Sequence, residues 1–170
     1  MKKQPISLAL LEQVVGRYRE IVPDWPGFIA ALQRPLPQCL WSNTLRSSGE
    51  ELHLLLVEAG MQPEPLPWRN DAFRILKPSS LAEQWWYLVG LAHCQEEVSQ
   101  LPVQLLDLQP GMRVWDMCAA PGGKTAQIAM ALQNSGTVVA NDIATGRLRA
   151  LSGNLERLGL VNIVTTRADA

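Results

Sequence analysis

The residues with the clearest chemical potential form one short loop. Asp116 closes an apolar run, small residues and the glycine pair Gly122-Gly123 follow it, and a helical pattern begins near Lys124. Residues with almost no side chain let a ligand lie against backbone amides at the start of a helix, and glycine can take a positive φ there. The sequence therefore predicts a small-molecule cofactor site between a strand and a helix.

Two classes of cofactor compete for this loop. A phosphate cradle of the P-loop type requires Gly, four residues, and then Gly-Lys-Ser/Thr. Gly123, Lys124 and Thr125 fit the end of that pattern, but its first glycine would fall on Cys118. An acid at Asp116 would repel a triphosphate but suits a cofactor that carries a cationic amino group and a sulfonium. S-adenosyl-L-methionine fits this description, and a P-loop nucleotidase is the alternative.

A second acid follows the next predicted strand, residues 137–143. Asp142 stands 20 positions after Gly122, the spacing at which an acid meets ribose hydroxyls in dinucleotide-binding folds. The same acid also has the position of a helix N-cap, because a helical pattern begins at Ala144. In combination with the loop, the pattern favours ribose binding.

Several segments together resemble one known family, the Sun/NOL1/NOP2 (RsmB/RsmF-like) RNA cytosine-C5 methyltransferases. The segments are Asp-Met-Cys-Ala-Ala-Pro-Gly-Gly-Lys-Thr (116–125), Ala140-Asn141-Asp142, Arg147 to Leu151 with Asn154, Arg157 and Gly159, and Asp169. Upstream, the chain is similar to further family segments, nearest to the bacterial ribosomal RNA branch. These are Gln95-Glu96 with Ser99 and Leu101-Pro102, and Arg34-Pro35 with Asn43 to Arg46.

The resemblance implies an S-adenosyl-L-methionine-dependent RNA methyltransferase, with ribosomal RNA favoured over transfer RNA as the partner. In the family an acid lies beside the adenine at the position of Asp169, which by itself reads as an exposed terminal acid. The residues expected to contact the cofactor are Cys118, Ala119, Ala120, Pro121, Gly122, Gly123, Lys124, Asp142 and Asp169. A non-catalytic cofactor- or RNA-binding remnant is a further alternative.

No catalytic residue is assigned. The family's two catalytic cysteines lie in Pro-Cys and Thr-Cys motifs, and the three cysteines of this chain, Cys39, Cys94 and Cys118, lie in neither. Cys118 would face the cofactor rather than the base, and we expect Cys39 and Cys94 to be buried or inert thiols. The chain alone is therefore expected to be inactive. The spacing of the three cysteines also suggests no metal site.

Composition limits the partners. The net charge of −1 gives no global electrostatic signature for nucleic acid, so an RNA-facing surface must be local. No apolar run reaches membrane-spanning length. We expect a cytoplasmic protein without a membrane partner.

The expected fold class is α/β: the first half of a Rossmann-like class I methyltransferase sheet, preceded by a small α+β domain. Residues 1–78 are expected to form the amino-terminal RNA-side extension, 79–112 a connecting segment, and 113–170 a partial S-adenosyl-L-methionine-binding domain. The half-sheet would leave an edge that favours self-association.

Local signals predict the amino-terminal elements. Apolar spacing predicts one amphipathic helix over 8–22, and Asp24 is a candidate cap for a second. Ser48 with Glu51 predicts a capping box. The prolines of 61–70 exclude a central strand.

The tryptophans raise a separate question. Trp41 occupies a position where the family pattern usually carries arginine, so we expect either a lost phosphate contact or stacking of Trp41 on a base. The cluster at 85–89, which contains Trp85 and Trp86, is expected to be buried or at an interface.

Overall fold

The structure is a computed structural model that describes residues 7–170. Internal contacts divide the chain into two units, one ending at Leu36 and the other running from Pro37 to Ala170. No helix in the described part of the chain is long and apolar enough to cross a membrane.

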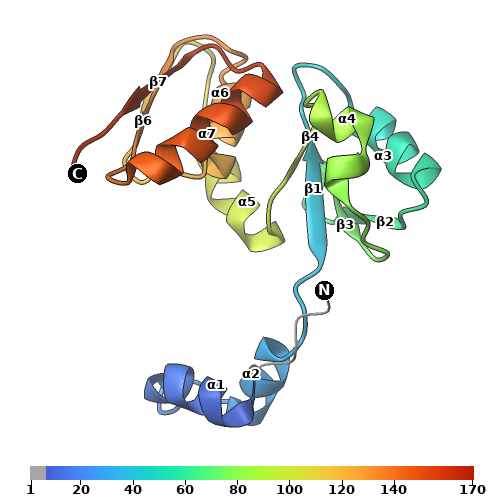
Figure 1. The fold of residues 1–170 in the computed structure, drawn as a ribbon, viewed down its shortest axis with the longest axis vertical. Helices are drawn as coiled ribbons and strands as arrows, with labels where there is room; N and C mark the ends of the chain where they lie inside the picture. Colours follow the sequence, from blue (N-terminus) through green and yellow to red (C-terminus); the bar gives the residue numbers. More distant parts are fainter. Residues whose placement is uncertain (1–6) are drawn as a thin grey trace. The chain divides into compact units, whose positions relative to one another are not determined.

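The first unit holds two short helices, α1 (Leu8–Val15) and α2 (Trp25–Leu32) (Figure 1). The predicted single helix over 8–22 is wrong beyond Val15, because the chain tightens there into a 3-10 turn that begins at Gly16. Glycine is a poor helix former, and such turns are common at helix ends. The predicted cap is confirmed, since Asp24 Oδ1 accepts a hydrogen bond from Gly27 N across 2.9 Å.

The second unit contains two sheets. The first is antiparallel, with the spatial order β2-β3-β1-β4, and the second is parallel, with the order β5-β6-β7. The strands of the first sheet are β1 (Gln38–Ser42), β2 (Pro63–Leu66), β3 (Arg69–Ile75) and β4 (Ala92–Cys94). The strands of the second are β5 (Arg113–Asp116), β6 (Thr137–Asn141) and β7 (Ile163–Thr166). The proline-rich β2 is an edge strand, as its sequence predicts.

Five helices accompany these sheets. They are α3 (Gly49–Glu58), α4 (Trp85–Leu88), α5 (Glu97–Gln104), α6 (Gly123–Ala131) and α7 (Thr145–Leu158). The capping box of α3 is confirmed: Ser48 Oγ accepts from Glu51 N, and Glu51 Oε2 accepts from Ser48 N. Strand β4 comes from the predicted connecting segment, yet it pairs with β1. The division at residues 78 and 112 stays a prediction.

Strand β1 faces two separate cores. Leu40 packs in a cluster with Leu52 and Leu56 of α3, whereas Trp41 packs in the cluster that contains α6, α7 and β6. Successive strand residues point to opposite faces of a sheet, so this alternation is what the geometry requires. The hypothesis that Trp41 stacks on a base is wrong, because its side chain is fully buried in the structure.

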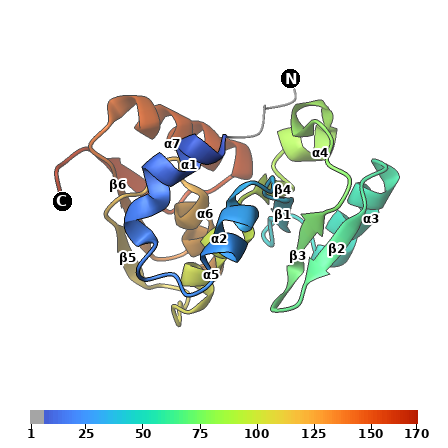
Figure 2. The same cartoon turned by 90° about the horizontal axis from the view of Figure 1, so that it is seen from below.

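Within the second unit, residues 37–170, helices cover one face of the parallel sheet. Helices α6 and α7 pack against it through the cluster that includes Val138, Ala140 and Leu151 (Figures 1 and 2). On the other face Trp115, Val139 and Val164 are aligned in register across the three strands, and Trp115 and Val164 are more than half exposed. Parallel sheets are normally covered on both faces, whereas no element of residues 37–170 covers this apolar row.

The two tryptophans of the 85–89 cluster differ in their exposure to solvent. Trp86 is buried, as expected, against the core of the first sheet, whereas Trp85 is exposed.

Candidate functional site

The loop between β5 and α6 is built around Gly122. This residue is the N-cap of α6 and has a φ of 104°, a conformation that favours glycine. A Cβ atom at Gly122 would also lie 3.3 Å from Leu151 Cγ. Backbone conformation and close packing therefore both require glycine at this position.

The loop is attached to the carboxyl end of β6 by its backbone. Ala119 N donates to Asn141 O across 2.8 Å, and Ala120 N donates to Asp142 Oδ2 across 3.2 Å. The structure thus brings the glycine-rich loop and the second predicted acid into direct contact, although more than twenty residues separate them in the sequence.

Asp142 is almost completely buried and already has several partners. Besides Ala120 N, its carboxylate accepts from Ala144 N and forms an ion pair with Arg147, whose Nη1 lies 3.1 Å from Asp142 Oδ2. The Arg147 guanidinium also donates to Ala120 O. Asp142 therefore supports the start of α7, as the capping interpretation suggests, even though the N-cap residue itself is Ala144. Ribose binding stays a prediction.

Asn141 connects the ends of all three parallel strands. Its Nδ2 donates to Met117 O across 3.1 Å and to Ala168 O across 3.0 Å, and its Oδ1 accepts from Thr166 Oγ1 across 3.0 Å. Residue-type reasoning assigned Asn141 no role; its only sequence signal is its place beside Asp142 in the Ala-Asn-Asp segment.

A small cavity of about 100 Å³ lies where these strands end. Of the predicted contact residues it brings together Cys118, Asp142 and Asp169. Its lining consists of Met117, Cys118, Asp142, Ile143, Arg147, Ala168, Asp169 and Ala170. Cofactor pockets typically enclose about 300–1,000 Å³, so this cavity has room for only part of a nucleoside cofactor.

The other predicted contacts form the loop and the first turn of α6 rather than the cavity wall. Ala119, Ala120 and Gly122 are buried, whereas Pro121 and Lys124 are exposed. Asn154 Nδ2 of α7 holds the loop by donating to Pro121 O across 3.0 Å. The sequence offered no rule by which Asn154 or Arg147 would be found, beyond their place in the family pattern.

The hydroxyl of Thr125 is engaged within the protein. Thr125 Oγ1 donates to Asp116 Oδ2 across 2.6 Å, and this short contact with an acid is unlike the metal-bound hydroxyl of a P-loop. In residues 7–170, no group of three or more His, Cys, Asp or Glu side chains could hold a metal ion. The geometry gives no support to the nucleotidase alternative.

Two of the three thiols are poor nucleophiles. Burial raises the pKa of both Cys39 and Cys94, which keeps them protonated and less reactive. Cys118 is exposed and lines the cavity.

Comparison with known proteins adds independent information. Residues 103–170 match the family model described as 16S rRNA methyltransferase RsmB/F. The chain is 37% identical over 160 residues to ribosomal RNA small subunit methyltransferase F of Shigella dysenteriae serotype 1, covering 89% of this chain and 33% of that protein. The corresponding protein of Aliivibrio fischeri is 36% identical and is matched over 96% of this chain and 36% of its own length. The chain thus spans about a third of these relatives.

A solved structure, that of a methyltransferase homologue protein from Pyrococcus horikoshii, is also similar. It is 32% identical, with a TM-score of 0.81, over 96% of this chain and 57% of that one. The parallel sheet β5-β6-β7 with α6 and α7 is therefore part of a Rossmann-like class I methyltransferase fold, and the fold-class prediction is confirmed.

Proposed function

We propose that this chain, whose sequence corresponds to the amino-terminal part of the RsmB/F methyltransferase family, forms the cofactor half-site of an S-adenosyl-L-methionine-dependent RNA cytosine-C5 methyltransferase. The observation that carries the proposal is the convergence of Cys118, Asp142 and Asp169 on one cavity beside the glycine-rich loop. Ribosomal RNA is the proposed substrate, because the curated relatives are named for it. Transfer RNA is the alternative substrate.

The residues present fit this cofactor. Asp142 and Asp169 both line the cavity, and we propose that the first carboxylate binds the ribose hydroxyls and that the second lies beside the adenine. A Cβ atom at Gly122 would lie 3.3 Å from Leu151 Cγ, so the absence of a side chain lets the loop pack closely on α7. The cofactor supplies an electrophilic sulfonium methyl group. The chain's part is to bind and orient the molecule that carries it.

The nucleophile of the reaction is not among the residues described. Methylation at cytosine C5 requires a thiolate to add to C6, which makes C5 a carbon nucleophile. The pKa of Cys39 and that of Cys94 are raised by burial, and Cys118, which lines the cavity, is proposed to face the cofactor. We propose that this chain by itself binds cofactor without transferring a methyl group.

Self-association is proposed as a second property. The exposed row that includes Trp115 and Val164 lies on the uncovered face of a parallel sheet. Such apolar surfaces mark interaction sites. Sedimentation of the purified chain against a Trp115→Ser variant tests this: the variant should shift the weight-average mass toward the monomer.

Calorimetric titration with S-adenosylhomocysteine tests the main proposal. We expect saturable binding that Asp142→Asn weakens about tenfold, equivalent to about 1.4 kcal/mol, while Asp107→Asn, an exposed acid outside the site, leaves it unchanged. ATP with magnesium should give no heat of binding. Absence of S-adenosylhomocysteine binding by the folded chain would contradict the proposal, and binding of ATP instead would favour the nucleotidase.

A further inference from the structure

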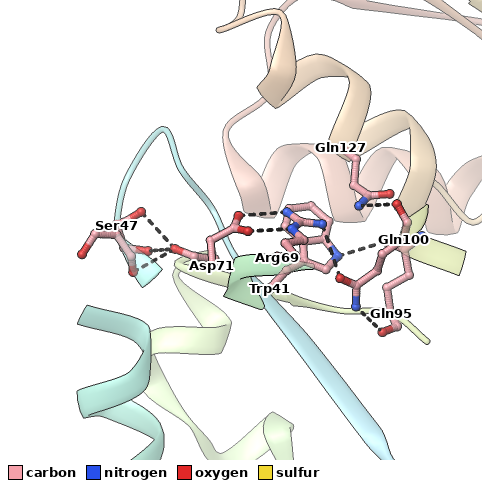
Figure 3. Close-up of polar contacts among 9 residues, drawn as sticks. Trp41, Ser47, Arg69, Asp71, Gln95, Gln100 and Gln127 are labelled. Atoms are coloured by element: carbon pink, nitrogen blue, oxygen red, sulfur yellow. Dashed lines mark hydrogen bonds and ion pairs between the residues drawn. The ribbon is translucent and has the colours of Figure 1, made fainter. Parts of the chain in front are cut away.

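A chain of partly buried contacts leads from Asp71 of the first sheet through Arg69 and Trp41 to Gln95, and Figure 3 shows these side chains close together. It begins at Asp71 of β3, whose carboxylate accepts two hydrogen bonds from Arg69, at 2.6 and 2.9 Å. The Arg69 guanidinium lies over the ring of Trp41, 5.1 Å from its centroid. Only 8% of the Arg69 side chain is exposed, so this ion pair is held in a fixed geometry.

The chain continues through Gln95, which follows β4. Trp41 Nε1 donates to Gln95 Oε1 across 2.9 Å, and Gln95 Nε2 donates to Ser99 O across 3.0 Å. The indole can only donate and the carbonyl can only accept, so both ends of the Gln95 amide have a defined orientation. Its backbone is fixed as well, because Gln95 N donates to Cys39 O and Gln95 O accepts from Gln100 Nε2.

The Gln95 amide packs directly on the first residue of α6. A Cβ atom at Gly123 would lie 3.2 Å from both Cδ and Nε2 of Gln95, closer than ordinary van der Waals contact. Gly123 has no positive φ. Its lack of a side chain is therefore explained by the approach of Gln95 rather than by backbone conformation.

We infer that Gln95 is a positioning residue for the cofactor loop. Trp41 and Ser99 fix the amide of Gln95, and the amide fixes Gly123 and, with it, the loop that ends at Gly122. The first sheet and the cofactor loop are thereby one mechanical unit. The inference that this unit governs cofactor affinity rests on the proposed function. The inference that Gln95 braces the loop does not depend on it.

Hydrogen–deuterium exchange of the ligand-free chain tests the bracing. We expect Gln95→Ala to speed exchange in residues 117–126 about tenfold, because loops open more often when their packing is lost. The strands of the first sheet should keep their protection. Gln104→Ala, the same change at an exposed position of α5, is the matched control and should leave the loop at the wild-type rate. Trp41→Phe, which keeps a ring but removes the N–H donor, should produce a smaller acceleration in the same segment.

A double-mutant cycle makes the test specific. Gly123→Ala should also speed loop exchange, because the new Cβ pushes against the Gln95 amide. In the Gln95→Ala background the same change should add little, since the space is then free, and this non-additivity is the signature of direct contact. Unchanged loop exchange in Gln95→Ala, acceleration spread evenly over the whole chain, or fully multiplicative effects in the cycle would each overturn the inference.

Titration of the same variants with S-adenosylhomocysteine separates the two proposals. If the wild-type chain binds, Gln95→Ala should weaken binding about five- to tenfold while Gln104→Ala does not. If the wild-type chain does not bind, the proposed function fails, and the exchange experiment still decides whether Gln95 braces the loop.

Discussion

Arg157 Nη2 donates a hydrogen bond to His93 Nδ1 across 2.9 Å. Arginine has no acceptor, so Nδ1 carries no proton and the imidazole is neutral, with its hydrogen on Nε2. Burial and, secondarily, the charge of Arg157 lower the pKa of His93 from 6.5 to about 4. Arg157 belongs to α7 and His93 to β4, so this contact joins the first sheet to the methyltransferase fold.

The neutral His93 predicts a pH dependence of stability. Between pH 4 and 6.5 the unfolded chain binds a proton at this position that the folded chain does not. The part of the free energy of unfolding that depends on a neutral His93 is fully present above pH 6.5. It is lost as the pH falls toward 4, by up to about 3 kcal/mol. Urea unfolding at pH 7.5, 6 and 5 measures how the free energy of unfolding changes with pH. His93→Asn should flatten the dependence in this window. An unchanged slope in His93→Asn would contradict the assignment.

Asn141 is predicted to be the most sensitive amide at the site. In Asn141→Asp a carboxylate would face the carbonyl oxygens of Met117 and Ala168, which lose their donors. We expect the free energy of unfolding to fall by about 3 kcal/mol or more. Asn154→Asp makes the same chemical change where only one carbonyl, that of Pro121, loses a donor, and should cost about 1 kcal/mol. Urea unfolding measures the loss of stability in both variants. Equal losses would show that the hydrogen bonds of Asn141 to the three strand ends stabilise the fold no more than the single bond of Asn154.

A substitution at Gln127 of α6 is predicted to have the opposite effect on stability. Its Oε1 is buried with no hydrogen-bond partner in the described part of the chain, and its Nε2 makes only one long bond of 3.4 Å, to Gln100 O. Gln127→Met removes an unsatisfied acceptor and keeps the side chain's length. We expect stability to be unchanged or to rise by about 1 kcal/mol.

The neighbouring Gln100 serves as the contrast for that experiment. Its amide bonds Gln95 O at 3.0 Å and receives a long contact from Arg69. Gln100→Met should therefore cost about 2 kcal/mol. Thermal unfolding of both variants gives the comparison, and a large loss in Gln127→Met would mean that its Oε1 is satisfied in solution.

Much of the fold follows from signals that are local in the sequence. The helix caps at Asp24 and Ser48 involve residues three positions apart, and the prolines of β2 restrict that strand to an edge wherever it pairs. The glycine at position 122 is also a local signal, because its φ of 104° is a conformation that favours glycine. These features depend on short-range hydrogen bonding and sterics, which the residue types alone specify.

Predictions from local sequence patterns were wrong where tertiary packing determines the structure. The helix over 8–22 satisfied the apolar period but stopped at Val15. Trp41 had no sequence signal that distinguished an exposed base-stacking role from a buried one, and its burial depends on which face of β1 meets α6.

By itself, then, the sequence indicated the glycine-rich loop between a strand and a helix, the resemblance to a methyltransferase family and the parallel strands of the second sheet. Only the tertiary structure decided that Asn141 joins three strand ends, that Asp142 is paired with Arg147, and that Gln95 packs on Gly123. The Asn141 and Gln95 contacts each join residues more than twenty positions apart, and the Asp142–Arg147 pair depends on how β6 and α7 are placed. The energies of such contacts depend on burial and orientation, which arise only once the sheets and helices have packed.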